Sequence, residues 1–388
     1  KGEGWYEIHP LLRRYFRDKL EASPHAEPAK RRYCAIMAKK SAEMPQNPTV
    51  EIVEDFKPFL LHLQASVGEY PEYIADEDLF WSYTGLARYY EGQGLYAIAE
   101  PYYQACLTAT RTRLGDNHPG VATSLNNLAY LYYSQGRYPE AEPLYLEALD
   151  LLKRLLGDNH PHVATSLNNL AYLYYSQGRY PEAEPLYLEA LDLYKRLLGD
   201  NHPLVATSLN NLAGLYESQG RYPEAEPLYL EALDLRKRLL GDNHPDVATS
   251  LNNLAGLYES QGRYPEAEPL YLEALDLKKR LLGDNHPQVA NSLNNLAGLY
   301  ESQGRYPEAE PLYLEALDLY KRLLGDNHPD VALSLNNLAA LYRSQGRYTE
   351  AEPLYLQALA IAEQALGENH PNTIIFRENY NICLRRGG

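Results

Sequence analysis

The sequence predicts an all-α fold of helix pairs stacked in tandem, and two observations carry this prediction. The string Leu-Asn-Asn-Leu-Ala begins six times at intervals of 42 residues, from Leu125 to Leu335. A Gly-Asp-Asn-His-Pro or Gly-Glu-Asn-His-Pro string recurs at the same interval and ends first at Pro119 and last at Pro371. A fixed period of this length is typical of solenoids, because each unit buries its apolar face only against its neighbours.

Each repeat has the pattern of two helices. In the repeat 121–162, the apolar positions of the first helix, over about 121–134, lie on one stripe at helical spacing. Gly136 follows this helix, as a left-handed helix end requires. A second helix is predicted over about 139–156, and Gly157 ends it. The stripe of the first helix comprises Ala122, Leu125, Leu128, Ala129 and Tyr132.

Together with Gly136, Tyr138, Ala141, Tyr145 and Ala148, this stripe resembles the tetratricopeptide repeat. The 42-residue period and the Asn-His-Pro loop resemble the kinesin-light-chain type of that repeat. The resemblance covers about residues 79–388, and a divergent first copy starts near Leu79. It implies a right-handed superhelical α-solenoid with seven helix pairs over 75–371. A C-terminal capping helix, 372–388, would close the stack.

The N-terminal part has a different pattern. Residues 1–20 resemble the last part of the winged-helix region in STAND-type (NB-ARC-like) ATPases, where a short strand near Trp5 precedes a basic amphipathic helix. This resemblance implies an ATPase domain N-terminal of Lys1, with the solenoid as its sensor arm. Residues 21–74 are predicted as a helical linker or degenerate repeat, with helices at about 27–44 and 49–67 separated by Pro45 and Pro48.

Composition narrows the classes of function. The formal charge of −16 disfavours nucleic acid and anionic membranes as main partners. The sequence contains no run of about 18 apolar residues, so no membrane-spanning helix is predicted. Three widely spaced cysteines favour a reducing compartment, so we expect a cytoplasmic protein. Basic runs on the second helices, such as 236–238 and 278–280, are predicted to lie in solvent.

Nothing in the sequence suggests chemistry. We find no phosphate-binding loop and no catalytic set, and we predict neither cofactor nor enzyme activity. The histidine that recurs once per repeat, at His118 and its equivalents, does not predict a metal site. Adjacent repeats lie about 10 Å apart, whereas zinc ligands converge on one ion at about 2 Å. A structural role in the loop is therefore the expectation.

The first helices are expected, from the family resemblance, to line a concave groove. Asparagine is unfavourable inside helices by up to about 0.7 kcal/mol relative to alanine, so the Asn pairs need a compensating interaction. One role is to clamp the backbone of an extended peptide, since a carboxamide both donates and accepts. The other is an inter-repeat hydrogen bond that sets the stacking, and we expect one Asn of each pair in each role. The pairs are Asn126 and Asn127, Asn168 and Asn169, Asn210 and Asn211, Asn252 and Asn253, Asn294 and Asn295, and Asn336 and Asn337.

The groove positions that vary between copies divide it into zones. The early repeats carry tyrosine, the middle repeats glutamate, and the last pair arginine. Drift on a solvated face is the alternative explanation. We expect a protein or peptide ligand with an aromatic or apolar segment over the tyrosines and a basic segment over the glutamates. A passive spacer or self-assembly module is the rival function, and the oligomeric state is left open. The zone residues are Tyr130, Tyr133, Tyr172, Tyr175, Glu217, Glu259, Glu301 and Arg343.

Overall fold

The N-terminal helices pack onto the start of the repeat array. The structure is a computed structural model that describes residues 18, 19 and 21–387. Its first helices are α2 (Ala26–Ala42), α3 (Val50–Phe56) and α4 (Leu60–Gly68). The single helix expected at 49–67 is thus interrupted by a 3₁₀ turn at Lys57–Phe59, where Pro58 lacks the N–H of a continuous helix. The strand and helix expected within 1–20 lie outside the described residues, apart from 18 and 19.

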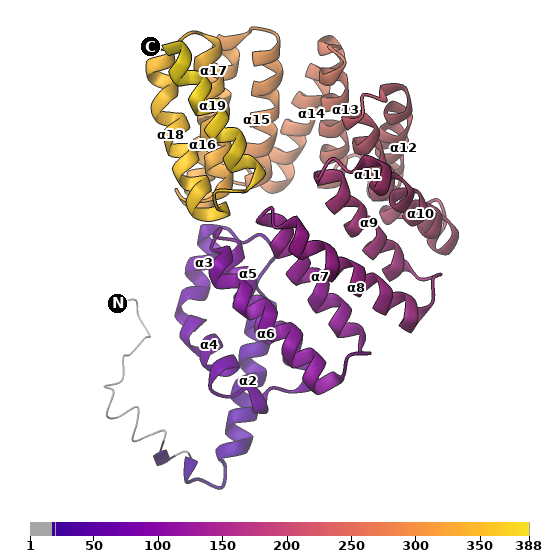
Figure 1. The fold of residues 1–388 in the computed structure, drawn as a ribbon, viewed down its shortest axis with the longest axis vertical. Coiled ribbons are helices and arrows are strands. Elements are labelled where there is room, and N and C mark those ends of the chain that lie inside the picture. Colours follow the sequence, from indigo (N-terminus) through magenta and orange to yellow (C-terminus); the bar gives the residue numbers. More distant parts are fainter. Residues whose placement is uncertain (1–17, 20, 388) are drawn as a thin grey trace.

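Seven helix pairs and a final helix follow in the described part of the chain (Figure 1). Helix α2 contacts α5, the first helix of the first pair, as a preceding second helix would. The helices are α5 (Leu79–Glu91), α6 (Tyr96–Leu114), α7 (Pro119–Ser134), α8 (Tyr138–Leu156), α9 (Pro161–Ser176), α10 (Tyr180–Leu198), α11 (Pro203–Ser218), α12 (Tyr222–Leu240), α13 (Pro245–Ser260), α14 (Tyr264–Leu282), α15 (Pro287–Ser302), α16 (Tyr306–Leu324), α17 (Pro329–Ser344), α18 (Tyr348–Leu366) and α19 (Pro371–Gly387).

Both ends of the first helices follow from the recurring strings. From α7 onward, each first helix begins at the proline, whose missing N–H costs nothing at that position, and so does α19. The preceding histidine caps it: Nδ1 accepts a hydrogen bond of 3.0–3.2 Å from the backbone N–H two residues later. Gly136 and its equivalents adopt positive φ after each first helix. The recurrent histidine therefore has a structural function in the loop.

The repeats stack through one continuous core and a recurring surface clamp. Ala129 and Ala141, with no exposed surface, allow close approach of the helices. In the clamp between α12 and α13, the guanidinium of Arg263 lies 4.0 Å from the ring centroid of Tyr258 and donates to Glu226 of the preceding repeat at 2.8 Å. Tyr258 donates to the same carboxylate at 3.1 Å. Equivalent arginines lie 4.0–4.1 Å from their tyrosines along the array, so the clamp joins each repeat to the preceding one.

Two basic side chains expected in solvent are in fact buried. Arg236 is 8% exposed and Lys278 is 6% exposed, because they occupy the register position that Tyr194 and Tyr320 fill in other repeats. Arg236 donates to Ser250 at 2.8 Å and to the carbonyl of Asp246. Lys278 has no hydrogen-bond partner among the described residues, and burial lowers its pKa to about 8. The prediction for these two residues was wrong because local pattern does not reveal the seam between repeats.

Replacing Lys278 by leucine, the residue at the equivalent position 152, should raise the free energy of unfolding by about 1–3 kcal/mol at pH 7. The folded-state pKa lies below the ordinary value of 10.5, so the wild type gains stability as pH rises from about 8 toward 10.5. The advantage of Lys278→Leu should therefore shrink between pH 7 and pH 9.5 in urea titrations. The control is Lys279→Leu, which removes a partly exposed pair with Glu315 and should change stability by less than about 1 kcal/mol. Equal effects of the two variants would contradict this account.

Candidate functional site

The first helices face the inside of the curved stack. Consecutive first helices contact one another, as α9 with α11 and α11 with α13, whereas consecutive second helices do not make contacts of that extent. Elements on the inner side of a curved stack lie closest together. In Figure 1, α9 and α11 correspondingly lie nearer the centre of the molecule than α10 and α12. The predicted groove residues of the first helices thus share one inner surface, which we call the groove.

The first asparagine of each pair lies between repeats. Asn168, Asn294 and Asn336 are 7–9% exposed. The carboxamide oxygen of Asn210 accepts a hydrogen bond of 2.9 Å from Asn253, and Asn252 accepts one of 3.0 Å from Asn295. In the same way, Asn379 of the capping helix donates to Asn336 at 3.0 Å. These contacts make Asn210, Asn252 and Asn336 inter-repeat links. Asn168 donates to Ser208 of the next repeat at 2.9 Å, whereas Oδ1 of Asn126, Asn168 and Asn294 is buried without a partner among the described residues.

The second asparagine of each pair is half-buried and closer to solvent. Asn253 and Asn295 use their amide N–H groups for the links just described, which leaves their carbonyl oxygens available. Asn127, Asn169 and Asn211 form no hydrogen bond with other described side chains. At these repeats the carboxamides could face a ligand without breaking the stack.

The last pair differs from the expected division of roles. The carbonyl oxygen of Asn337 accepts a 3.5 Å hydrogen bond from Asn336 of its own pair, so it is partly occupied rather than free for a ligand. As at Asn126 and Asn168, Oδ1 of Asn294 is buried without a partner among the described residues, so no link joins Asn337 to Asn294. Because the side chain of Asn336 turns toward its neighbour here, Asn337 is a weaker candidate for peptide contact than the second asparagines of the earlier repeats.

The four groove tyrosines form one continuous strip. The ring centroids of Tyr130 and Tyr133 lie 6.1 Å apart, those of Tyr133 and Tyr172 5.2 Å apart, and those of Tyr172 and Tyr175 6.0 Å apart. Tyr130 and Tyr172 are 39% and 44% exposed. The tyrosine strip thus presents ring surface along α7 and α9, the first helices of two successive repeats.

The three groove glutamates are partly buried and bridge neighbouring elements. Glu259 accepts hydrogen bonds from Tyr271 at 2.9 Å and from Ser302 of the next first helix at 3.2 Å. Glu217 and Glu301 repeat this arrangement. Burial raises the pKa of all three carboxyls. Since an ionised carboxylate offers about four acceptor positions, each retains capacity for a cationic ligand group.

At the register position of Tyr133, the first and last repeats carry Glu91 and Arg343. Glu91 of α5, which we did not predict, occupies the register position of Tyr133, 42 residues earlier. It is 8% exposed, accepts a 2.6 Å hydrogen bond from Tyr103, and has a pKa that burial raises to about 7. Extending the register by one repeat would have found it. At the other end, Arg343 donates to Asn379 of α19 at 3.3 Å, so its guanidinium is directed partly at the cap.

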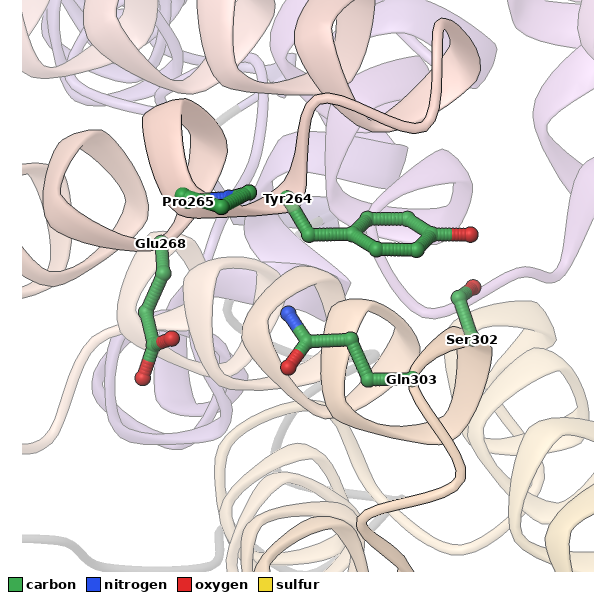
Figure 2. A pocket seen from close by; sticks show the side chains of 5 residues that line it. All are labelled: Tyr264, Pro265, Glu268, Ser302 and Gln303. Carbon is green, nitrogen blue, oxygen red and sulfur yellow. The ribbon is translucent and has the colours of Figure 1, made fainter.

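A pocket opens between repeats beside the glutamate zone. Figure 2 shows Tyr264, Pro265 and Glu268 at the start of α14 facing Ser302 and Gln303 at the end of α15, with the Tyr264 hydroxyl directed toward Ser302. Ser302 itself donates to Glu259. Glu268 is already engaged by Tyr300 and Arg305 of the clamp. An aromatic ring and a carboxylate therefore lie near the same opening.

Other kinds of site were sought in the described part of the chain. None of its helices combines the length and hydrophobicity that a membrane crossing needs. No cluster of three or more His, Cys, Asp or Glu side chains there is arranged to hold a metal ion. The three cysteines, Cys34, Cys106 and Cys383, are buried and unpaired.

Comparison with known proteins adds solved structures of similar repeat proteins. BtubC (BKLC) from P. vanneervenii is 29% identical, with 61% of this chain and 94% of that chain covered and a TM-score of 0.48. A kinesin-light-chain candidate from Podosopora anserina with nearly identical TPR-like repeats is 28% identical, with 53% and 97% covered and a TM-score of 0.43. A Rap protein complexed with Competence and Sporulation Factor shares the fold at 15% identity, with 86% and 97% covered and a TM-score of 0.53.

The comparison with curated proteins found no significant match. The family model for the tetratricopeptide repeat matches in overlapping windows from residue 78 to residue 388. These windows cover most of the chain and coincide with the helix pairs from α5 onward. The chain belongs to the tetratricopeptide repeat family, whose members generally serve as protein-interaction scaffolds rather than enzymes.

Proposed function

We propose that this protein binds an extended peptide segment of a partner protein along the groove. The observation that carries the proposal is that the stack leaves three of the second asparagines free. Asn210, Asn252 and Asn336 accept hydrogen bonds across repeats, whereas no hydrogen bond between described side chains engages Asn127, Asn169 or Asn211. Carboxamides repeated along one surface match the alternating N–H and C=O groups of an extended backbone. Such a ladder binds backbone and leaves sequence preference to other residues.

Sequence preference would come from the two zones. The tyrosine strip suits an aromatic or apolar segment, since its rings offer stacking surface over two repeats. Glu217, Glu259 and Glu301 suit a basic segment. Gly214, Gly256 and Gly298 of the same helices carry no Cβ, and only a tyrosine hydroxyl lies near that position, at 3.4–3.6 Å, so a ligand can approach the backbone there. The pocket beside Tyr264 and Ser302 offers room for one Lys or Arg side chain near Glu259.

A peptide array tests the proposal. Peptides that combine a basic stretch with an aromatic or apolar stretch should be enriched among binders, and salt should weaken their binding. The control variant carries Glu217→Gln, Glu259→Gln and Glu301→Gln, which retain hydrogen-bonding oxygens but remove three charges. Peptide binding by this variant should lose most of its dependence on salt. Enrichment of acidic peptides would contradict the charge assignment, and absence of any binder would favour a spacer or self-assembly function.

Two wider expectations belong to the same proposal. If an ATPase domain lies N-terminal of Lys1, the solenoid would act as its sensor arm and pass on ligand binding to it. That idea rests on the resemblance of residues 6–20, which lie outside the described part except for 18 and 19. The second is a cytoplasmic location, which the unpaired buried cysteines favour because they suit a reducing compartment.

A further inference from the structure

The two ends of the repeat array meet. A Cβ atom placed on Gly94, in the α5–α6 loop, would lie 2.8 Å from Cδ of Pro329, the first residue of α17. A Cβ on Gly136, one repeat later, would lie 2.8 Å from Cδ of Pro371 and 2.9 Å from Cδ2 of His370. Both glycine–proline pairs are 235 residues apart, so two consecutive repeats dock with the same register. Figure 1 shows the C-terminal helices beside α3 and α5.

The equivalent loop glycines of the other repeats have no such neighbour. At Gly178, Gly220, Gly262, Gly304 and Gly346 a Cβ would meet nothing within 4 Å. The histidines give a second comparison: the side chain of His328 is 13% exposed, whereas that of His244, in an equivalent loop with the same following aspartate, is 38% exposed. Contact with the N-terminal repeats therefore covers His328.

Two more contacts join the ends. The imidazole of His370 forms a hydrogen bond with the backbone of Ser134 at the end of α7. Because Nδ1 of His370 already accepts from the N–H of Asn372, the other ring nitrogen donates to Ser134. In addition, α3 contacts α16, and Thr49–Glu51 line a cavity together with Asn285 and Arg322.

This contact lies at one end of the groove. Asp330 follows Pro329 at the start of α17. His370 and Pro371 reach Ser134 and Gly136, which follow Tyr130 within two turns at the end of α7. In agreement, burial raises the pKa of Tyr130, and the charges of Glu91 and of Asp330 add to that shift. The C-terminal loops thus border the N-terminal end of the groove.

We propose that the contacts of Gly94 with Pro329 and of Gly136 with His370 and Pro371 form a latch. The latch closes the solenoid into one superhelical turn and controls access of a ligand to the groove at Tyr130. The second part rests on the proposed function, whereas the closure itself does not. A solenoid whose repeats contact only their neighbours changes its pitch easily, and contacts between residues 235 positions apart restrain that motion.

Paired glycine variants test the latch in the full chain. Gly94→Asn with Gly136→Asn introduces side chains at φ +71 and +67, where they collide with Pro329, His370 and Pro371. The matched control, Gly178→Asn with Gly220→Asn, has nearly the same backbone strain at φ +69 and +71 but open space. Small-angle scattering should show a larger radius of gyration and maximum dimension for the latch variant alone. Unchanged scattering, or equal changes in both, would overturn the proposal.

Histidine variants cover the case in which the glycine variants fold poorly. His370→Ala and His202→Ala each remove one helix cap, but only the first also removes the hydrogen bond to Ser134. Hydrogen exchange in the α7–α8 loop should accelerate in His370→Ala and stay unchanged in His202→Ala; equal behaviour would contradict the latch. With a peptide from the array, the open variant should associate faster. An unchanged association rate in a variant that scattering shows to be open would overturn the control of access while leaving the closure intact.

Discussion

Replacing Tyr229 by alanine is expected to lower the free energy of unfolding by about 3–5 kcal/mol. Its ring is 4% exposed, so truncation leaves a cavity between α11 and α12. Its hydroxyl also donates to Glu217 at 2.8 Å, and the variant leaves this half-buried carboxylate with Ser260 as its remaining partner. Urea titration followed by circular dichroism measures the loss, and hydrogen exchange should locate it in the repeats around α11 and α12 because solenoid repeats are coupled mainly to their neighbours.

The contribution of the hydroxyl can be separated from that of the ring. Tyr229→Phe should lower the free energy of unfolding by about 1.5–3 kcal/mol, the range for a hydrogen bond to a charged group. Tyr145→Phe, at the same position two repeats earlier, is the matched control. Residue 133 is tyrosine there, and the Tyr145 hydroxyl has no glutamate partner in its own repeat. Tyr145→Phe should leave the free energy of unfolding nearly unchanged. Equal costs at both positions would show that the Tyr–Glu bridge does not stabilise the stack.

The first asparagines are expected to be structural. Asn210→Ala with Asn252→Ala removes two partly buried carboxamides and leaves the N–H groups of Asn253 and Asn295 without their acceptors. An unsatisfied buried group costs about 1–3 kcal/mol, so the double variant should have a free energy of unfolding lower by about 2–6 kcal/mol. The better helix propensity of alanine offsets part of this loss. Thermal unfolding measures the change. A double variant as stable as the wild type would show that these links do not hold the repeats together.

The regular part of the fold could be predicted because every local signal recurs in register. His-Pro starts a helix, Gly136 and its equivalents end one, and the apolar stripe has no competing period. In the N-terminal part only one copy of each signal exists. The interruption at Pro58 was therefore missed, although proline inside a predicted helix is its usual cause.

Contacts between distant repeats could not be predicted in the same way. Whether Pro329 reaches Gly94 depends on the rotation between neighbouring repeats, accumulated over more than five repeats. A small error per repeat would separate the two loops. The burial of Lys278 and the different hydrogen bonding of Asn337 likewise depend on the seam between repeats, where the sequence gives residue types but no geometry. The candidate groove residues were predicted from variation among nearly identical copies, which marks one helix face, and their role in binding stays a prediction.

The most direct test of peptide binding uses the asparagines that the stack leaves free. Asn127→Ala, Asn169→Ala and Asn211→Ala remove no hydrogen bond between described side chains, and alanine favours the helix, so thermal stability should stay equal or rise. Calorimetric titration with the tightest basic peptide from the array should then show a rise in Kd of roughly 10- to 1,000-fold, which corresponds to three lost hydrogen bonds of about 0.5–1.5 kcal/mol each. An unchanged Kd in this stably folded variant would contradict the carboxamide clamp and with it the proposed mode of binding.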